Sequence, residues 1–178
     1  MDSRFGAIIK NIINFIDFIS ERSGYLIAWL VLSIVVIVVY DVSMRGLFHL
    51  GSVALQELQW HLFALIFLLG AAYTLKQDDH VRVDIFYQSR WMNARRRAWV
   101  NLLGGLLLLM PFCLLVITSS WQFVYDAFIY QEGSPDPGGL PYRFLLKASI
   151  PIGFSLLMLQ GIAEILRNLL YLLDKNQE

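Results

Sequence analysis

Residues 24–40 read GYLIAWLVLSIVVIVVY, a stretch without a charged side chain. A helix rises about 1.5 Å per residue, so about 20 apolar residues cross the hydrocarbon core of a bilayer. Continuation of the helix through Asp41 to Arg45 supplies the missing length. A soluble helix carries a polar stripe at helical spacing, and this stretch has none. It therefore predicts a membrane-spanning helix.

Three further apolar stretches have a similar length. Together with the first they predict spans at about 24–45, 53–75, 98–125 and 144–171. Pro111 and Pro151 lie inside the last two, and we expect each to kink its helix rather than end it. Apolar residues make up 57% of the 178 residues and charged residues 16%, which is unlike a soluble domain. The predicted fold is an all-α integral membrane protein with a single membrane domain over residues 1–178.

The lysines and arginines predict the orientation of the spans. With a cytoplasmic N-terminus, eleven of the 14 lie on the cytoplasmic side, and only Arg45, Arg143 and Lys147 lie outside. The reverse orientation inverts this ratio. The first twenty residues contain Asp2, Asp17 and Asn14 and therefore do not resemble a cleavable signal peptide. We expect a multi-pass protein of the bacterial inner membrane with both termini in the cytoplasm.

Two segments predict helices on the membrane surface. Residues 3–21 place isoleucines at i, i+3 and i+4 spacing with polar side chains between them, which is typical of an amphipathic helix in the headgroup plane. Residues 85–97, between the second and third spans, combine aromatic side chains with four arginines. Their basic side is expected to face anionic lipid on the cytoplasmic side.

Polar side chains within spans are candidate sites because their burial in lipid is costly. Glu57 and His61 share one face near the external end of the second span; solvation by headgroups, a partner contact and an ion or proton relay are all compatible with this position. Glu164 lies between Gln160 and Arg167 and predicts either a local pair with Arg167 or a partner contact. Asp41 and Arg45 predict a helix ion pair. The candidates for a partner interface are Glu57, Trp60, His61, Gln160 and Glu164.

No pattern in the chain predicts an enzyme, a metal site or a cofactor. Haem ligation by two histidines needs both inside the bundle, and only His61 lies in a span. No Ser/His/Asp grouping, HExxH sequence or glycine-rich phosphate loop is present. Cys113 is interpreted as a packing residue. The net charge of zero gives no reason to expect a nucleic-acid partner.

Two loop segments are distinctive. Residues 76–84 read KQDDHVRVD, in which His80, Arg82 and Asp84 alternate with valines; this favours a short extended stretch at the cytoplasmic surface or a solvated turn. Residues 132–141 read EGSPDPGGLP, whose prolines and glycines predict a shaped external turn. That turn either docks another protein or only closes the hairpin.

These segments resemble the small permease subunit, of the DctQ type, of tripartite ATP-independent periplasmic (TRAP) transporters. The resemblance rests on HVRVD at 80–84 after the second span, on Glu57 and Trp60 at the start of that span, and on SPDPGGLP at 134–141 followed by Lys147. It covers roughly residues 25–167. The turn is also similar to that of the subgroup labelled mannitol/chloroaromatic transport.

The resemblance implies a scaffold subunit in a sodium-coupled importer of an organic acid or related solute. It implies two partners, a large permease subunit of the DctM type and a soluble periplasmic binding protein of the DctP type. The substrate and sodium sites then belong to the large subunit, and this chain has no catalytic or substrate-binding residue. Contacts with the binding protein are expected at Phe48, Ser52, Glu132, Asp136, Gly138 and Gly139. The alternatives are a membrane-anchor or redox subunit of an enzyme complex and a free-standing small channel or exporter.

Overall fold

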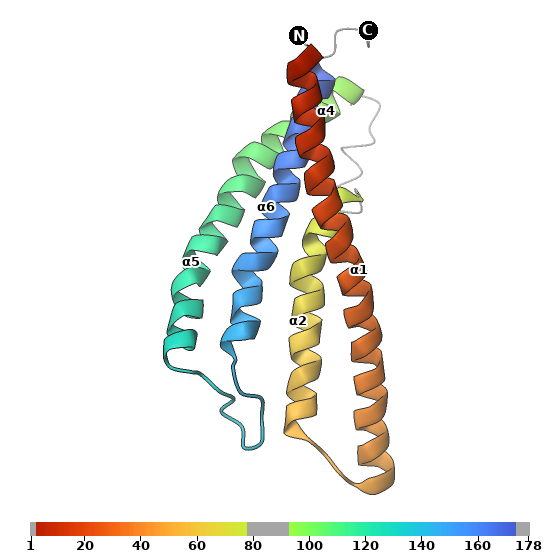
Figure 1. Cartoon of the computed structure of the whole chain (residues 1–178), viewed down its shortest axis with the longest axis vertical. Helices are drawn as coiled ribbons and strands as arrows, with labels where there is room; N and C mark the ends of the chain where they lie inside the picture. The colour runs from red at the N-terminus through yellow and green to blue at the C-terminus, as the bar shows by residue number, and fades with distance from the viewer. Residues whose placement is uncertain (1–2, 78–92, 174–178) are drawn as a thin grey trace.

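A computed structural model describes residues 3–77 and 93–173 (Figure 1). The elements are α1 (Ser3–Phe48), α2 (Val53–Lys76), α4 (Ala94–Gly104), the π-helical turn η1 (Gly105–Leu109), α5 (Met110–Ile129) and α6 (Phe144–Leu173). No strand occurs among these described residues. Four helical runs are long and apolar enough to cross a membrane: α1, α2, the continuous run 94–129, and α6. The all-helical architecture with four candidate spans is therefore confirmed.

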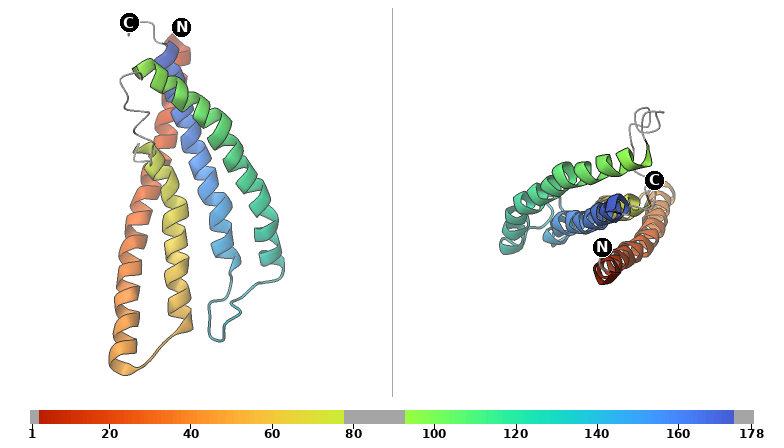
Figure 2. Two further views of the ribbon diagram at one scale, coloured as in Figure 1. Left: turned by 180° about the vertical axis from the view of Figure 1, so that it is seen from behind. Right: turned by 90° about the horizontal axis from the view of Figure 1, so that it is seen from above.

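The helices stand side by side in the order α5, α6, α2 and α1 (Figure 1). Helix α6 is central and contacts α2, α5, α4 and α1, and the view along the bundle shows it between α4–α5 and α1 (Figure 2). Both ends of the described chain lie at one end of the bundle, which we call the termini end. The loops 49–52 and 130–143 lie at the opposite end, the hairpin end.

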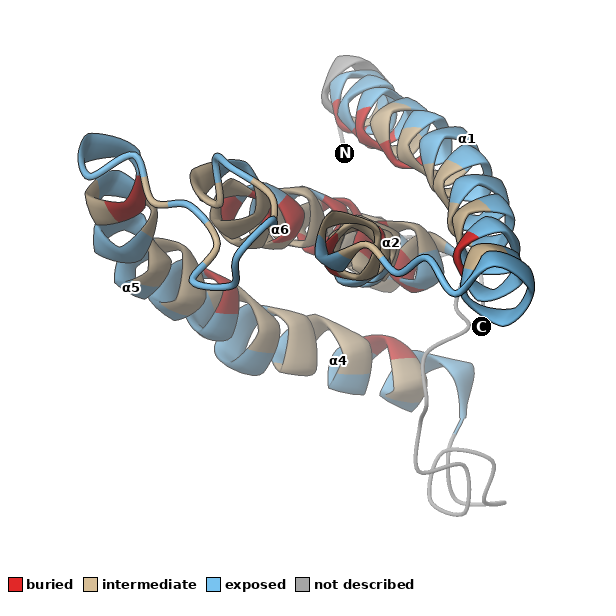
Figure 3. Ribbon diagram, turned by 90° about the horizontal axis from the view of Figure 1, so that it is seen from below, coloured by how far each residue is buried: buried red, intermediate tan, exposed pale blue. Residues whose placement is uncertain are grey.

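Small residues bring α6 close to its neighbours. A Cβ atom on Gly153 would lie 2.7 Å from the Leu68 carbonyl oxygen of α2, and one on Gly161 would lie 2.6 Å from the Met110 side chain of α5. At Gly153 the obstacle is backbone, so only glycine fits there, whereas at Gly161 a larger residue would require the Met110 side chain to move. Close approach at small residues is a common way for membrane helices to pack. The buried residues of the bundle accordingly concentrate on α6, whereas α1 is largely exposed (Figure 3).

Helix α1 corrects the expected division between a surface helix and the first span. Residues 3–21 are helical, but they continue into the span without a break (Figure 1). Its 46 residues extend about 69 Å, more than the 40–45 Å of a whole bilayer. The isoleucine stripe of Ile9, Ile13 and Ile16 is buried against Ala163 of α6. These three isoleucines therefore pack on protein, and residues 3–21 form one helix with the first span rather than a separate one. Their position at the membrane surface stays a prediction.

The third run also differs from its expected bounds. Residues 94–97 are the first turn of α4 and belong to the run that continues to Ile129. The rest of the expected surface helix, residues 85–92, lies outside the described residues. Before Pro111, the Met110 N–H donates to the Gly105 carbonyl in a π-helical turn, so the run passes the proline without ending. Helix α6 likewise continues through Pro151.

Candidate functional site

Glu57 of α2 holds the loop that joins α5 to α6. Its side chain is buried. The carboxylate accepts hydrogen bonds from the Ser134 hydroxyl and from the Leu140 N–H, the latter at 2.6 Å. Hydrogen bonds to an ionised carboxylate are among the stronger ones in proteins. One side chain therefore fixes both limbs of the loop, and we call Glu57, Ser134 and Leu140 the loop clamp.

The loop is a compact turn whose shape depends on glycine. The Gly139 N–H donates to the Asp136 carbonyl at 3.0 Å, and Gly138 has a φ of 80°, which favours glycine. A Cβ on Gly139 would lie 2.4 Å from the Ser134 hydroxyl oxygen and 2.7 Å from the Glu57 carboxylate. Glycine at this position therefore lets the clamp close.

Lys147 connects the same loop to α6. Its ammonium group pairs with the Glu132 carboxylate and lies 3.8 Å from the centroid of the Phe123 ring of α5. The ion pair and the cation–π contact both compensate the lysine charge within this chain. The hairpin end is thus held by α2 through Glu57 and by α5 and α6 through Lys147.

His61 and Trp60, which lie close to Glu57 on α2, differ in how far their side chains are exposed. The His61 Nδ1–H donates to the Glu57 carbonyl of its own helix at 2.6 Å, and the ring is half-buried. Trp60, in contrast, is 72% exposed. Of the residues around the clamp on α2, Trp60 offers the largest free side-chain surface.

Asp41 connects α1 to α2 close to the hairpin end. It is buried, pairs with Arg45 four residues later, and accepts a hydrogen bond from Gln59 Nε2 of α2 at 3.2 Å. The predicted Asp41–Arg45 pair is therefore confirmed. The structure adds that this pair also joins the two helices of the first hairpin.

A second group of polar contacts joins α1 to α6 toward the termini end. Arg167 donates to both carboxylate oxygens of Asp17, at 2.9 and 3.1 Å. Gln160, whose side chain is fully buried, donates to Asp17 at 3.1 Å and accepts from the Ser20 hydroxyl at 2.6 Å. Three pairs of polar side chains thus join α1 to α6: Asp17 with Arg167, Asp17 with Gln160, and Ser20 with Gln160.

The same group extends to α2. Lys76 donates to the Glu21 carboxylate at 2.5 Å and to the Asp17 carbonyl at 3.2 Å, and Arg167 also pairs with Glu164. Positive and negative side chains therefore alternate across the contact between three helices. We call this group the charge network; it contains Asp17, Ser20, Glu21, Lys76, Gln160, Glu164 and Arg167.

The polar candidates for a partner interface bond within this chain. Glu57 belongs to the loop clamp, and Gln160 and Glu164 belong to the charge network. The local Glu164–Arg167 pair, one of the two interpretations of the sequence, is present. A partner contact at these positions stays a prediction. His80, Arg82 and Asp84 lie outside the described residues.

The candidates for contact with a binding protein lie at the hairpin end. Phe48 is exposed at the end of α1, and Asp136 is exposed in the loop. The Ser52 hydroxyl caps α2 by accepting from the Leu55 N–H at 3.4 Å, and Glu132 is half-buried beside Lys147. Together with Gly138 and Gly139 they share one end of the molecule, and contact with a binding protein there stays a prediction.

Sequence reasoning missed several partners of the polar residues. Asp17 and Ser20 were not singled out, although Ser20 continues the buried stripe of Ile9, Ile13 and Ile16 at helical spacing. That continuation is a signal that Ser20 faces another helix. The contacts of Glu57 with residues 77 and 83 positions away left no signal in the sequence.

The described residues show no metal site. Within 3–77 and 93–173, no group of three or more His, Cys, Asp or Glu side chains is arranged to hold a metal ion.

One comparison with known proteins gives a match. A family model described as "Tripartite ATP-independent periplasmic transporters, DctQ component" matches residues 34–170, which is more than half of the chain. No curated protein matches the chain. The matched range includes the loop clamp and the α6 side of the charge network, whereas Asp17 and Ser20 precede it.

Proposed function

The chain belongs to the DctQ family of tripartite ATP-independent periplasmic transporters, and on this premise we propose that it is the static scaffold of a sodium-driven importer. The family makes it the small membrane subunit of a tripartite ATP-independent periplasmic transporter, a transport component and not an enzyme. In our proposal it works with a large permease subunit and a soluble periplasmic binding protein. The imported solute is a small organic acid or a related compound.

The observation that carries the scaffold role is how the polar groups of the spans are used. Within residues 3–77 and 93–173, the carboxylates of Glu57, Asp41 and Glu164 all bond to other groups of this chain. The exposed surface of the spans is largely apolar. A solute and its coupling ion need polar groups at the middle of the membrane, commonly at interrupted helices. The arrangement supports the role of a rigid scaffold, and in our proposal the large subunit binds and moves the solute.

We propose that the termini end faces the cytoplasm of a bacterial inner membrane. The arginine run 95–97, Lys76, Arg22 and Arg167 are toward that end, whereas Arg45, Arg143 and Lys147 are toward the hairpin end. This distribution follows the preference of cytoplasmic loops for lysine and arginine. Fusion of alkaline phosphatase or a fluorescent protein after residue 178 tests it. Fluorescence without phosphatase activity supports the orientation, and the opposite result contradicts it.

For the large subunit we propose an interface on α2. Trp60, Phe63 and Phe67 are 72%, 66% and 71% exposed and follow each other at helical spacing. They form an aromatic stripe on the helix that also carries the loop clamp. Tryptophan and other aromatic residues are enriched at protein interfaces and contribute a large share of their binding energy.

The interface is tested by replacing Trp60 and Phe63 with alanine and measuring co-purification with the large subunit. We expect the yield of the complex to fall about tenfold, which corresponds to about 1.4 kcal/mol. The matched control is Trp121→Ala in α5, which is 66% exposed on another helix. Equal yields from both variants, or a loss only with the control, would contradict the assignment.

For the binding protein we propose docking at the hairpin end. The loop clamp holds residues 130–143 in one conformation, and Phe48 and Asp136 are exposed beside it. A pre-shaped loop binds with less loss of conformational entropy than a flexible one. A photoreactive amino acid at Asp136 should crosslink to the binding protein. Crosslinks from the large subunit alone would contradict this docking site.

The transport role itself is tested in proteoliposomes. We expect solute uptake only when this chain, the large subunit, the binding protein and an inward sodium gradient are all present. Uptake by this chain alone would overturn the scaffold proposal. Uptake by the large subunit at full rate without this chain would do so as well.

A further inference from the structure

The N-terminal part of α1 carries two parallel rows of mostly apolar side chains. The first, which we call the contact seam, faces α6 and consists of Ile9, Ile13, Ile16 and Ser20. The second, which we call the outer seam, consists of Ile8, Ile12, Phe15 and Ile19. Both rows follow the same spacing of four, three and four residues. The outer seam precedes the contact seam by one residue, which turns it about 100° around the helix.

The outer seam is largely exposed. Ile8, Ile12 and Phe15 are 58%, 44% and 65% exposed, and Ile19 is half-buried. Apolar residues at this spacing form the line along which two helices pack side by side. A helix with one neighbour needs one apolar stripe, and α6 already covers the contact seam. The outer seam therefore indicates a second neighbour.

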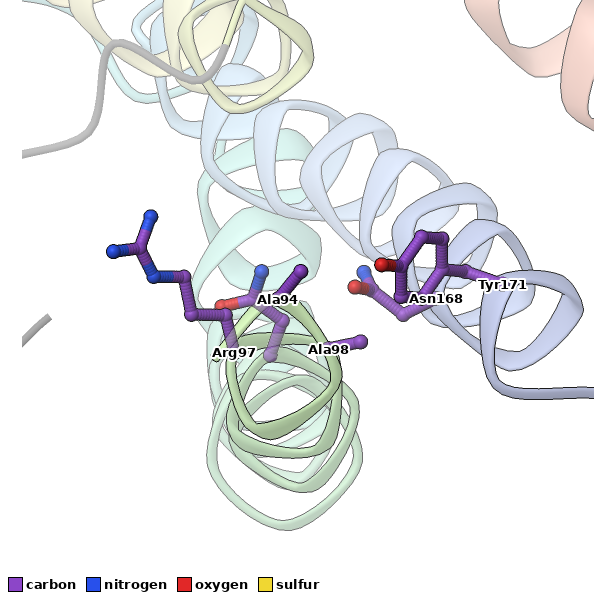
Figure 4. A pocket seen from close by; sticks show the side chains of 6 residues that line it. Ala94, Arg97, Ala98, Asn168 and Tyr171 are labelled. Atoms are coloured by element: carbon purple, nitrogen blue, oxygen red, sulfur yellow. The ribbon is translucent and has the colours of Figure 1, made fainter. Parts of the chain in front are cut away.

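The described helices do not supply this neighbour. Helix α6 is between α1 and α4 at the termini end, and Ala98 of α4 faces Asn168 on another side of α6 (Figure 4). Helix α2 ends at Lys76, which pairs with Glu21 and therefore stops short of the outer seam. Whatever covers the outer seam comes from outside the part of the chain that the structure describes.

The bilayer does not reach most of the outer seam when α1 crosses it upright. Residues 23–40 contain no charged side chain and extend about 27 Å, which matches a hydrocarbon core of about 30 Å and places Arg22 at headgroup level. Ile8 precedes Arg22 on the same unbroken helix by about 21 Å. The headgroup layer adds only about 5–8 Å on each side, and a usual tilt of about 20° shortens the distance little. An apolar patch at this height is typical of a protein contact.

Two observations indicate the chemistry of the neighbour. The seam continues into the span with the same spacing, where Leu26 and Trp29 are 52% and 69% exposed, so a helix that also enters the membrane fits it. Arg22 stands in the seam between Ile19 and Leu26, and its guanidinium lies 5.2 Å from the centroid of the Phe18 ring. In a parallel pair of two copies of this chain, Arg22 would face its own like charge. A carboxylate on a different chain would complement it.

We propose that the outer seam binds a helix of the large permease subunit that continues from a span into the cytoplasm. The bound helix has an apolar seam of its own and a carboxylate opposite Arg22. Helix α1 is the last helix of the row, so a large neighbour has access to it along its whole length. The interface rests on the proposed function, and it is separate from the aromatic stripe of α2.

The test uses the complex of the full chain co-expressed with the large subunit. A photoreactive amino acid at Ile12 should crosslink to the large subunit. The matched control places the same amino acid at Asn14, which is exposed on the polar face of the same helix and should give little of this product.

A second measurement is the yield of the purified complex. We expect Ile12→Glu to lower it about tenfold, whereas Asn14→Glu, which adds the same charge two residues later, should leave it unchanged. Arg22→Glu should lower the yield and Arg22→Lys should retain it, because only the first reverses the charge.

Several results would overturn the interface. Crosslinks from Ile12 to lipid would place residues 3–21 in the headgroup plane, and crosslinks to a second copy or within this chain would identify another occupant. Equal losses with Ile12→Glu and Asn14→Glu would show that the seam is not used. A melting curve of each variant reports its folding, and the crosslink decides the matter if Ile12→Glu does not fold. An intact complex without the Ile12 crosslink contradicts this interface alone, whereas the absence of any complex contradicts the proposed function.

Discussion

Different kinds of contact stabilise the two ends of the bundle. At the hairpin end, the Glu57 carboxylate reaches across from α2 and, together with the Lys147–Glu132 pair, fixes a loop. At the termini end, the charge network joins the helices α1, α2 and α6 directly, with Asp17 and Arg167 at its centre. Loss of the first contact therefore frees a loop, whereas loss of the second frees whole helices.

This difference matches what each end does in the proposed scaffold. A docking loop needs a fixed shape but adds little to the packing of the bundle. A helix of 46 residues such as α1 extends beyond the end of α2 and needs side-to-side contacts to keep its direction. Ion pairs and buried hydrogen bonds set a unique register between helices in some proteins, which we regard as the role of the charge network here.

The largest loss of stability is expected from separating α2 from α6, because the contact between these two helices supports both ends of the bundle. Gly153→Leu places a side chain where even a Cβ would lie 2.7 Å from the Leu68 carbonyl oxygen. Overpacking of this kind costs about 1–3 kcal/mol, and we expect about 3 here because the obstacle is backbone. The melting temperature in detergent should fall strongly, and both the loop and the network should loosen.

The control for this variant is another glycine of a spanning run. A Cβ on Gly104 has no atom within 4 Å, so Gly104→Ala should leave the melting temperature unchanged or raise it slightly. A Gly153 variant as stable as the Gly104 variant would show that the helices do not approach each other this closely.

Removal of Arg167 should have the second-largest effect on stability. Arg167→Met leaves the carboxylates of Asp17 and Glu164 without their common partner. Because the Arg167 side chain is 40% exposed, we expect a loss of about 1–2 kcal/mol, below the value for a fully buried pair. Thermal unfolding in detergent measures it.

Arg22→Met is the matched control, since Arg22 is exposed and lies 5.2 Å from the Phe18 ring. The double variant Asp17→Asn with Arg167→Met sharpens the test. It should be more stable than the sum of the single changes predicts, because it no longer leaves the Asp17 carboxylate unpaired. Simple additivity would argue against a coupled network.

Replacement of Glu57 should have the smallest global effect and the clearest local one. Glu57→Gln removes the negative charge of the carboxylate to which the Ser134 hydroxyl and the Leu140 N–H both donate. We expect hydrogen exchange of residues 134–140 to become about tenfold faster or more, while the melting temperature changes little. Asp136→Asn, in the exposed part of the same loop, is the control. A large fall in melting temperature without faster local exchange would remove the distinction between the two ends.

Much of the fold was predictable because lipid imposes a simple rule on the sequence. The uncharged stretch 24–40 and its three counterparts are long enough to cross a bilayer, and the helices confirm four such runs. The Asp41–Arg45 pair was predictable because its partners are four residues apart on one helix. The continuity of residues 3–21 with the first span was not predictable, because an isoleucine stripe has the same spacing whether it meets lipid or another helix.

The candidate site was less predictable, since its contacts join distant parts of the chain. Glu57 and Glu164 were identified as unusual polar residues within spans. Their partners Ser134 and Leu140, and the link from Arg167 to Asp17, depend on which helices are neighbours. The order α5, α6, α2, α1 is not encoded in any local pattern.

The sequence by itself determined that the chain is helical and membrane-spanning, because apolar length and the absence of charge are local properties that lipid selects directly. It also identified the family, through short motifs at fixed places between the spans. Only the tertiary structure decided that the polar residues of the spans serve one another and that α1 continues past its span along α6. These features depend on close approach at positions such as Gly153, and such proximity exists only once the helices have packed.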